Sequence, residues 1–403
     1  MKNLITFISI LSFSTQCYSF ESEDLANKVK QLEIEIEQLK SSVAVTEQTA
    51  EQKASGITLG GAVRFQYVYE DYNDDNSARG GDFDFDVFRL DLNGEVGGVI
   101  LSAQYRWFQY MNVIHHAWAG YDFDKQWQGQ IGVTRVPFGN LAYNSHNYFF
   151  SSNYYVGLED DYDAGIKFIR KSDKHDLRLA FFFTDEMGGI DGYVDDRTDR
   201  YSYDIVGVRA SDEGIWDQPV DEVAEHNTFN LRYAYQLDNI ELGFSWLTGD
   251  IRDASSSVGD RTAYAVHTDG QFGRWNVKLQ YTDYQYDFDQ HSNSIAVGAY
   301  SFYDSIPSEA KLYTVNVAYL KPVKFGPISS LNFYNNYNLM TDKSGDYNND
   351  TIMNVLGVAI ASGGLYTYVD LVSAKNQPFV GGTMAGDSDD WQTRFNINFG
   401  YYF

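Results

Sequence analysis

Basic side chains recur on the polar face of segments in which polar and apolar residues alternate. Alternation with a period of two is typical of β-strands, whose successive side chains point to opposite faces. A guanidinium stays charged when it leaves bulk water, and it then requires water or carboxylates beside it. The pattern therefore indicates strands whose polar faces line a wet interior. The cations on these faces are Arg64, Arg89, Arg106, Lys167, Arg178, Arg232, Lys278 and Arg394.

Four of these cations would form one continuous surface, which we name the basic wall. In a closed barrel the last strand pairs with the first, so the strands that carry the four residues would be neighbours. Alternatively, the arginines form salt bridges with interior acids such as Glu70, Asp91 and Glu241 and stiffen the structure. The two arrangements can coexist. The basic wall consists of Arg394, Arg64, Arg89 and Arg106.

Three consecutive acids lie where the long polar stretch 138–161 meets the next predicted strand. They are Glu159, Asp160 and Asp161. If this stretch folds into the barrel, we expect the acids to face the basic wall. Opposed charges across a constriction orient dipolar solutes and set ion preference.

The N-terminal sequence predicts export. The chain has 403 residues, a formal net charge of −26, 16% aromatic residues and one cysteine. MKNLITFISILSFSTQCYSF has a lysine, an apolar run and a polar end, which is typical of a secretory signal, and we expect cleavage after Ser19. Cys17 would leave with residues 1–19. The sequence contains no run of about 18 apolar residues, which a membrane-spanning helix requires.

Residues 20–55 are predicted to form a periplasmic coiled coil followed by a polar linker. Apolar residues repeat with heptad spacing over about three heptads. So short a coil depends on the rest of an oligomer for its stability. An amphipathic helix that folds back onto a soluble domain is the alternative. The seam residues are Leu25, Val29, Leu32, Ile36, Leu39 and Val43.

From Gly56 onward the alternation predicts an all-β protein, a 16-stranded antiparallel transmembrane β-barrel over 56–403. Short links alternate with long polar ones, as in outer-membrane barrels with short periplasmic turns and long outer loops. The segment 201–210 also has strand character, and we place it inside the fourth long loop. A soluble β-sandwich or propeller is the alternative fold.

The chain ends in WQTRFNINFGYYF, a strand with one apolar face and one polar face. Its apolar face would contact lipid in a barrel. The aromatic end predicts an assembly signal, made by Phe399, Tyr401 and Phe403, for the barrel-assembly machinery.

Residues 56–403 resemble the phosphate-selective porins O and P. The segment QIGVTRVPFGN, 130–140, is similar to the family's segment before the third outer loop. DAGIKF, 163–168, resembles the strand that resumes after it. The matching residues of the first segment are Gly132, Arg135, Pro137, Phe138 and Gly139.

This resemblance implies a homotrimer of sixteen-stranded barrels and passive diffusion of solutes. Arg135, which we add to the cations of the pore, stands where the family commonly has lysine. The loop NLAYNSHNYFFSSNYYVGLEDD contains no lysine, whereas phosphate-selective members have many basic residues in the pore and its loops. The solute is therefore left open among small anions, sugars and small hydrophilic solutes in general.

Most acids fall in the predicted outer loops, where they are solvated or bridge divalent cations to lipopolysaccharide. DYNDDNSARGGD, 71–82, is a weak candidate for Ca²⁺ because it lacks glycine at its sixth position. His115 and His116 are adjacent, so alternation should place them on opposite faces, and we expect packing rather than metal ligation. We expect no other cofactor and no metal site.

The sequence predicts a trimeric porin of the bacterial outer membrane that contacts lipid and lipopolysaccharide and passes small hydrophilic solutes. The negative charge excludes a generic nucleic-acid binder, and no G-x-S-x-G, H-E-x-x-H or P-loop motif indicates an enzyme. One rival is an outer-membrane hydrolase using His146 or His226. The other is an envelope tether or adhesin whose barrel is plugged, for instance by 187–226.

Overall fold

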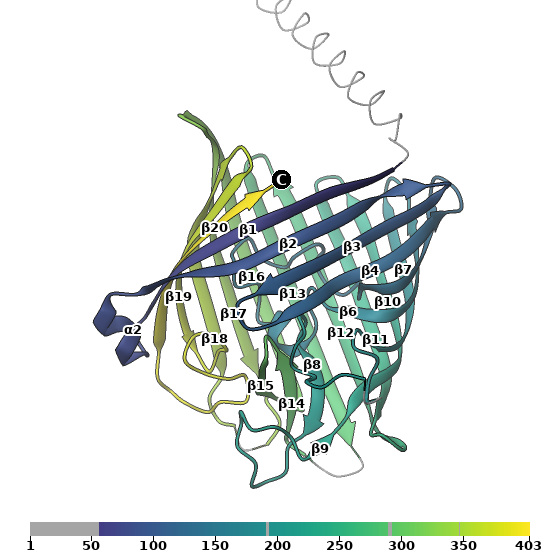
Figure 1. The fold of residues 1–403 in the computed structure, drawn as a ribbon, viewed down its shortest axis with the longest axis vertical. Helices are drawn as coiled ribbons and strands as arrows, with labels where there is room; N and C mark the ends of the chain where they lie inside the picture. Colours follow the sequence, from purple (N-terminus) through teal and green to yellow (C-terminus); the bar gives the residue numbers. More distant parts are fainter. Residues whose placement is uncertain (1–55, 191–192, 289–291, 346) are drawn as a thin grey trace, which may run out of the picture. The chain divides into compact units, whose positions relative to one another are not determined.

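The computed structural model describes residues 56–403 except 191–192, 289–291 and 346. The predicted signal peptide and coiled-coil seam lie outside the described residues. Sixteen strands form a closed antiparallel barrel, which confirms the predicted fold and strand number (Figure 1). The barrel strands are β1 (Gly56–Glu70), β2 (Asp82–Val96), β3 (Val99–Phe108), β4 (Asn112–Asp122), β5 (Trp127–Arg135), β6 (Tyr162–Lys171), β7 (His175–Asp185), β10 (Ala224–Leu237), β11 (Ile240–Arg252), β12 (Ser257–Phe272), β13 (Trp275–Phe288), β16 (Glu309–Phe325), β17 (Ile328–Thr341), β18 (Thr351–Ser362), β19 (Leu365–Lys375) and β20 (Gln392–Tyr402).

The barrel closes where β20 pairs with β1. The backbone N–H of Phe403 donates to the carbonyl of Gly61 at 3.1 Å, and the N–H of Gly61 donates to the carbonyl of Phe403 at 2.9 Å. The last residue of the chain therefore takes part in the closing hydrogen bonds. Closure leaves no strand of the barrel with an unpaired edge.

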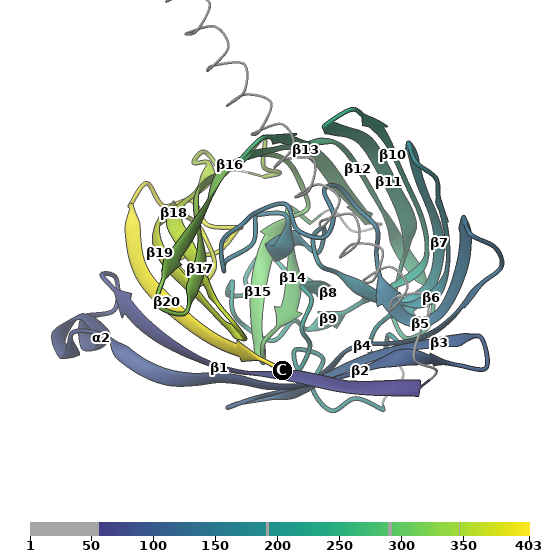
Figure 2. The same cartoon turned by 90° about the horizontal axis from the view of Figure 1, so that it is seen from above.

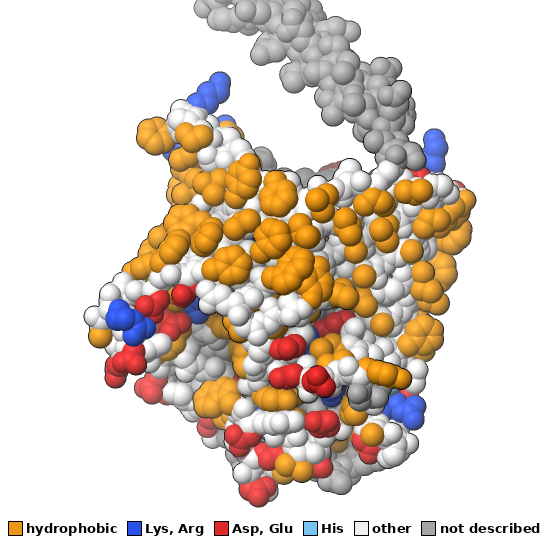
Figure 3. Space-filling view, viewed as in Figure 1, with side chains coloured by type: hydrophobic (Ala, Val, Ile, Leu, Met, Phe, Trp, Pro, Cys, Tyr) orange, Lys and Arg blue, Asp and Glu red, His pale blue; other side chains and the backbone are white. Residues whose placement is uncertain are grey.

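The strands present apolar side chains outward and polar side chains inward. In β16, Tyr313 and Val315 are 41% and 44% exposed, whereas Thr314 and Asn316 are 2% and 0% exposed. Figure 3 shows a broad apolar band across the visible face of the barrel, with acidic side chains gathered toward the end with the long loops. Such an outer surface suits contact with hydrocarbon. None of the helices in the described residues has the length and apolar character to cross a membrane.

Short turns lie at the end where the chain enters and leaves the barrel, and long loops lie at the other end (Figure 1). The predicted short outer link near Met111 is confirmed between β3 and β4. The predicted long loop 251–261 is wrong, because β11 and β12 continue into it and are joined by residues 253–256.

Residues 136–161, which we name the inner loop, fold into the barrel and reach its opposite wall. The loop contains one 3₁₀ turn, η1 (Tyr154–Val156). The N–H of Ser152 donates to Asn338 Oδ1 at 3.2 Å, and the N–H of Tyr148 donates to Asp370 Oδ2 at 3.2 Å. These acceptors belong to β17 and β19, so the loop crosses the lumen.

Two outer loops together form a second sheet of four strands, which we name the loop sheet. Its order is β15-β14-β8-β9. The segment 201–210 therefore contributes a strand outside the barrel, as predicted. Figure 2 shows the loop sheet within the ring of barrel strands, and Figure 1 places it toward the long-loop end. The strands are β8 (Asp204–Val208), β9 (Asp221–Glu222), β14 (Ser294–Ala299) and β15 (Phe302–Pro307).

Candidate functional site: a basic cavity in the barrel

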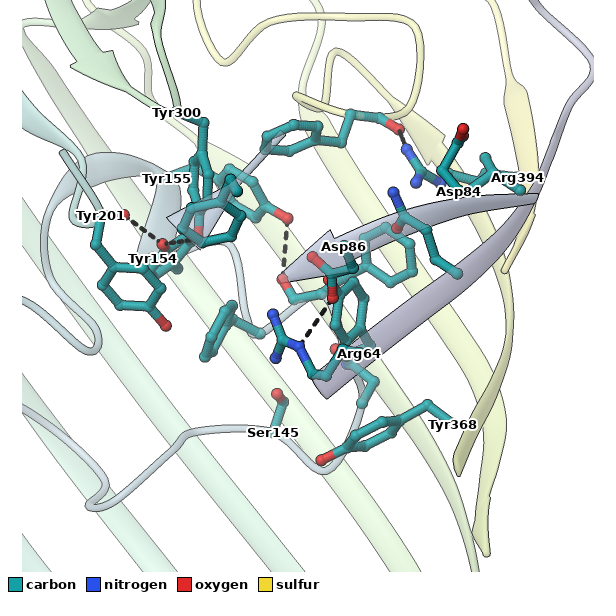
Figure 4. Close-up of a pocket in the computed structure, with 18 of the residues that line it drawn as sticks. Arg64, Asp84, Asp86, Ser145, Tyr154, Tyr155, Tyr201, Tyr300, Tyr368 and Arg394 are labelled. Carbon is teal, nitrogen blue, oxygen red and sulfur yellow. Dashed lines mark hydrogen bonds and ion pairs between the residues drawn. The ribbon is translucent and has the colours of Figure 1, made fainter. Parts of the chain in front are cut away.

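A cavity of about 910 Å³ lies inside the barrel beside the inner loop. All four residues of the basic wall line it. Figure 4 shows Arg64 and Arg394 among the lining residues. They lie together because β20, β1, β2 and β3 are consecutive in the barrel. Arg89 and Arg106 are directly opposite each other in the register of β2 and β3. Lys278, on β13, lines the same cavity.

Three of the four wall arginines form ion pairs. Arg64 Nε lies 2.8 Å from Asp86 Oδ2, and Arg89 Nη2 lies 2.8 Å from Asp91 Oδ2. Arg394 Nη1 lies 3.3 Å from Glu70 Oε1. The expected salt bridges with Asp91 and Glu70 are therefore present. They hold the guanidiniums in fixed orientations along the cavity.

Arg106 differs from the other three residues of the basic wall. Its Nε donates to Gln104 Oε1 at 2.7 Å, and its guanidinium carbon lies 4.2 Å from the centre of the Tyr201 ring. Among the described residues, no carboxylate lies within ion-pair distance of it. A cation that contacts a ring face and an amide is not neutralised by a negative charge. It therefore attracts other anions in the cavity more strongly than a cation in an ion pair with a carboxylate does.

Tyrosines from three loops also line the cavity, and two of them, Tyr148 and Tyr201, contact the basic wall. Tyr154 donates its hydroxyl to the carbonyl of Tyr201 at 2.6 Å, and its oxygen lies 2.7 Å from that of Tyr300. Tyr148 donates to Asp86 Oδ2 at 3.0 Å. Burial raises the pKa of Tyr300 to about 12, so its hydroxyl is neutral at pH 7. The sequence reasoning missed this group, whose only signal was the richness of the loops in tyrosine.

Asp160 is the one residue of the predicted acid group that meets a predicted pore cation. It forms an ion pair with Arg135 and accepts a hydrogen bond from Tyr201 at 2.8 Å. Its backbone has φ +53°. That left-handed conformation turns it away from the direction of its neighbours.

The predictions for Glu159 and Asp161 are wrong, because neither faces the basic wall. Glu159 accepts hydrogen bonds from the backbone N–H groups of Asn144 at 2.8 Å and Ser151 at 3.0 Å, so it shapes the inner loop itself. Burial raises the pKa of Glu159. Asp161 lies in a separate buried acid cluster beside Asp163. Adjacent residues entering a strand point to opposite sides.

Two further predicted pore cations bind the inner loop or its base. Lys167 donates to Thr134 Oγ1 at 2.6 Å and to the carbonyl of Arg135 at 2.7 Å. Arg232 donates to the carbonyl of Gly139 at 2.8 Å and pairs with Glu241, the third expected acid.

The remaining two cations also have protein partners. Lys278 donates to the carbonyl of Tyr143 at 2.6 Å. Arg178 pairs with Asp176 at 2.8 Å. The predicted cations therefore fall into two groups. One group forms the basic wall of the cavity, and the members of the other bind the inner loop, its base or a neighbouring acid.

The motif at 130–140 shapes the start of the inner loop. Gly139 has φ +61°, and a Cβ at this position would lie 2.2 Å from the side-chain oxygen of Gln280. Glycine therefore lets the loop pass close to β13. Gly132 has φ +125°, with the carbonyl of Ala117 only 2.4 Å from the place of a Cβ.

The prediction that alternation separates His115 from His116 is wrong. The two Nδ1 atoms lie 2.9 Å apart. The register of β3 and β4 shifts between Gln104 and Tyr105, so a bulge at His115 breaks the alternation. His116 Nε2 lies 2.9 Å from Ser102 Oγ, but its other nitrogen faces His115 rather than a carboxylate.

Residues of two other sequence hypotheses have protein partners in the structure. The proposed Ca²⁺ loop 71–82 contains the helix α2 (Asp74–Arg79), and Arg79 pairs with Asp82 at 2.7 Å. His146, a candidate of the hydrolase hypothesis, lies with its Nδ1 2.6 Å from Asn316 Nδ2. Burial, with a smaller contribution from Lys278, lowers the pKa of His146 to about 4.

No family model matches the sequence, and no curated protein matches it. Solved structures do resemble the chain. The anion-selective porin from Comamonas acidovorans has 12% identity and a TM-score of 0.56, covering 86% of this chain and 99% of that one. The outer membrane channel DcaP of Acinetobacter baumannii has 14% identity and a TM-score of 0.54, covering 87% and 99%.

A third similar structure is OmpF of Salmonella typhi in complex with daunomycin, at 10% identity and a TM-score of 0.55, covering 87% of this chain and 98% of that one. At identities this low, the comparisons show similarity of fold alone. The narrower resemblance to phosphate-selective porins O and P is not confirmed. The chain has the closed-barrel fold of bacterial outer-membrane porins.

Proposed function

We propose that the protein is a porin of the bacterial outer membrane through which small hydrophilic solutes diffuse down their gradients. The observation that carries this proposal is the cavity between the basic wall and the inner loop, inside a barrel with an apolar outer surface. Barrels of this kind occur as channels, and a loop folded into the lumen sets the width of the path.

In the proposed mechanism the basic wall selects among solutes. Arg64, Arg89 and Arg394 have acidic partners, so they present polar, nearly neutral pairs to the lumen. Arg106 supplies the net positive field. Small anions and dipolar solutes with an anionic group are therefore favoured, although the chain as a whole carries −26. Of the described residues, five cations line the cavity against four acids; the cations are Arg64, Arg89, Arg106, Lys278 and Arg394, and the acids are Glu70, Asp82, Asp84 and Asp86.

The assembly is proposed to be a homotrimer embedded in lipid and lipopolysaccharide, with the N-terminal coiled coil in the periplasm. The even number of strands brings both ends of the barrel to the side with the short turns. This side is the periplasmic one in barrels with long outer loops. The segment 20–55 would then extend into the periplasm.

Single-channel recording in a planar bilayer tests this function. Purified protein should insert with steps that close in threes, and the reversal potential in a KCl gradient should show preference for Cl⁻. Folded protein that passes no current would overturn the porin proposal. A clear preference for K⁺ would overturn the role of the basic wall.

A second function is supported by the position of the loop sheet. β8, β14 and β15 lie within the ring of barrel strands, and Ile205, Ile295 and Ile306 are fully buried. A barrel closed in this way would serve as an envelope anchor or tether. Deletion of 294–307 distinguishes the two functions, because it should create a current in a plugged anchor and only enlarge an existing current in a porin.

A further inference from the structure

Three buried carboxylates meet where the inner loop joins the barrel. Asp161 ends the inner loop, Asp163 lies in β6, and Asp204 is the first residue of β8 in the loop sheet. One oxygen atom from each lies within 4.8 Å of the other two. All three residues are at most 2% exposed. Three negative charges this close and this far from water repel one another strongly.

Several oxygens of this group lack hydrogen-bond donors among the described residues. They include both carboxylate oxygens of Asp163 and Oδ2 of Asp161. Glu225 of β10, which is 2% exposed, adds a fourth carboxylate that shares Arg261 with Asp163, and its Oε2 also has no donor. Buried carboxylate oxygens normally have partners. These oxygens are therefore available to a ligand.

The arginines around the group leave negative charge uncompensated. Six buried carboxylates are linked here by ion pairs or by the close approach of the three aspartates, and three guanidiniums form ion pairs with five of them. Burial and the charge of Asp204 raise the pKa of Asp161, which expresses the same imbalance. The carboxylates are those of Asp161, Asp163, Asp185, Glu186, Asp204 and Glu225, and the guanidiniums are those of Arg197, Arg200 and Arg261.

We propose that Asp161, Asp163, Asp204 and Glu225 bind a divalent cation, with Ca²⁺ as the preferred ion. Carboxylate oxygens without nitrogen or sulfur donors select hard cations. Ca²⁺ binds oxygens at about 2.4 Å, so two ligands on opposite sides of it are about 4.8 Å apart, whereas Mg²⁺ requires closer packing at about 2.1 Å. Oxygens at most 4.8 Å apart can all reach one Ca²⁺ ion, and a cage of protein carboxylates favours Ca²⁺ over Mg²⁺, which usually keeps several waters.

Such a cation would join three parts of the molecule that are far apart in sequence. Asp161 belongs to the inner loop, Asp163 and Glu225 to the barrel wall, and Asp204 to the loop sheet. The ion would therefore hold the inner loop and the loop sheet in the arrangement that bounds the cavity. This site differs from the Ca²⁺ loop hypothesised at 71–82, and it does not depend on transport.

Equilibrium dialysis with ⁴⁵Ca²⁺ tests the site on full-length mature protein refolded in detergent without lipopolysaccharide. We expect one Ca²⁺ per chain, with tenfold excess Mg²⁺ failing to displace it. Asp163→Asn and Asp204→Asn should each weaken binding at least about tenfold, since each removes a charged ligand. Asp212→Asn, a change of the same kind at an exposed position between β8 and β9, should bind as wild type.

Thermal unfolding gives a second readout that does not require a variant to bind metal. Wild-type protein should have a higher Tm in Ca²⁺ than in EGTA, because ligand that binds only the folded state stabilises it. In EGTA, Asp163→Asn should have a higher Tm than wild type, because it removes one of the repelling charges. The order should reverse in Ca²⁺. Absence of binding together with equal wild-type Tm in Ca²⁺ and EGTA would overturn the proposal, and protonated carboxylates would then explain the cluster.

Discussion

Arg106 is 7% exposed and lies at the cavity without a carboxylate partner among the described residues. The other three residues of the basic wall each form an ion pair with an acid. A pair of opposite charges has a field that falls off faster with distance than the field of a single charge. At the scale of residues, ion preference in the cavity should therefore depend on Arg106 more than on the other three.

Arg106→Gln should reduce the preference for anions. A unit charge about 8 Å from an ion in a water-like dielectric is worth roughly 0.5 kcal/mol, or about a twofold change for each ion. Because the energies of Cl⁻ and K⁺ change in opposite directions, the Cl⁻ to K⁺ permeability ratio should fall about fivefold. Reversal potentials in a KCl gradient measure this ratio. Arg106→Lys should retain most of the preference, and Arg79→Gln on the exposed helix α2 should retain all of it. An unchanged ratio in Arg106→Gln would contradict the assignment.

Asp304 should make the loop sheet less stable as pH rises. Burial raises its pKa to about 7, compared with about 3.9 for an ordinary aspartate. Between these values the folded sheet keeps a proton that the opened sheet releases, so raising the pH favours opening, by at most about 4 kcal/mol. Hydrogen exchange of amides 294–299, compared at pH 4.5 and 7.5 after correction for intrinsic rates, measures the effect.

Asp304→Asn supplies the control for this pH dependence, because its side chain is neutral throughout. Its protection in the loop sheet should change less between the two pH values than that of wild type. Equal changes in both proteins would assign the effect to other carboxylates.

Alternation and barrel closure predicted that the strands carrying the four arginines are neighbours, because both patterns place residues without any knowledge of the loops, and the strand order agrees. Sequence reasoning missed the tyrosines of the cavity and the cluster of Asp161, Asp163 and Asp204, since loops whose paths have no sequence period bring these side chains together. It misplaced His115 and His116 because a single bulge reverses the alternation. The errors therefore concern loops and bulges rather than regular strands.

At the scale of elements, the inner loop and the loop sheet support each other. Hydrogen bonds from Tyr154 tie η1 to Tyr201 and Tyr300, which precede β8 and β15. The strands of the barrel were predictable from period and link length, whereas the loop sheet pairs segments about ninety residues apart. Nothing local in either segment specifies that partner.

Tyr154→Phe should loosen this junction. It removes the donor to the buried carbonyl of Tyr201, which costs about 1–3 kcal/mol when the acceptor is left unsatisfied. Local opening of the inner loop and of β8 should then increase about 5- to 150-fold, which hydrogen exchange can detect. Tyr121→Phe, on the half-exposed side of β4, should leave exchange unchanged. Wild-type exchange in Tyr154→Phe would show that the loops are held by other contacts.

At the scale of the whole molecule, the final residue has two separable roles. Its backbone closes the barrel against Gly61, and its ring, 56% exposed, is the proposed assembly signal. Phe403→Ala should lower the folded fraction in cells several-fold, because it removes the ring, while refolding in detergent stays normal because the backbone bonds remain. Heat-modifiable migration on gels measures both fractions.

Two variants make this comparison sharper. Deletion of Phe403 should impair assembly in cells and refolding in detergent, since ring and backbone bonds are both lost. Leu59→Ala, which removes another exposed apolar side chain from the outer surface, should assemble normally. Normal assembly of Phe403→Ala would exclude the ring as a signal.

The pairing of β1 with β20 also determines when the molecule can finish folding. The first barrel strand, β1, obtains its second partner only after β20 has been made and exported. Closure of the barrel is therefore delayed until the rest of the barrel has been synthesised. At roughly 5–20 residues per second, a chain of 403 residues takes about 20–80 s to emerge. During that time the edge of β1 is open to pairing with other chains. A protein of this topology therefore depends on factors that shield unfinished strands, and faster export, rather than greater native stability, would reduce its aggregation.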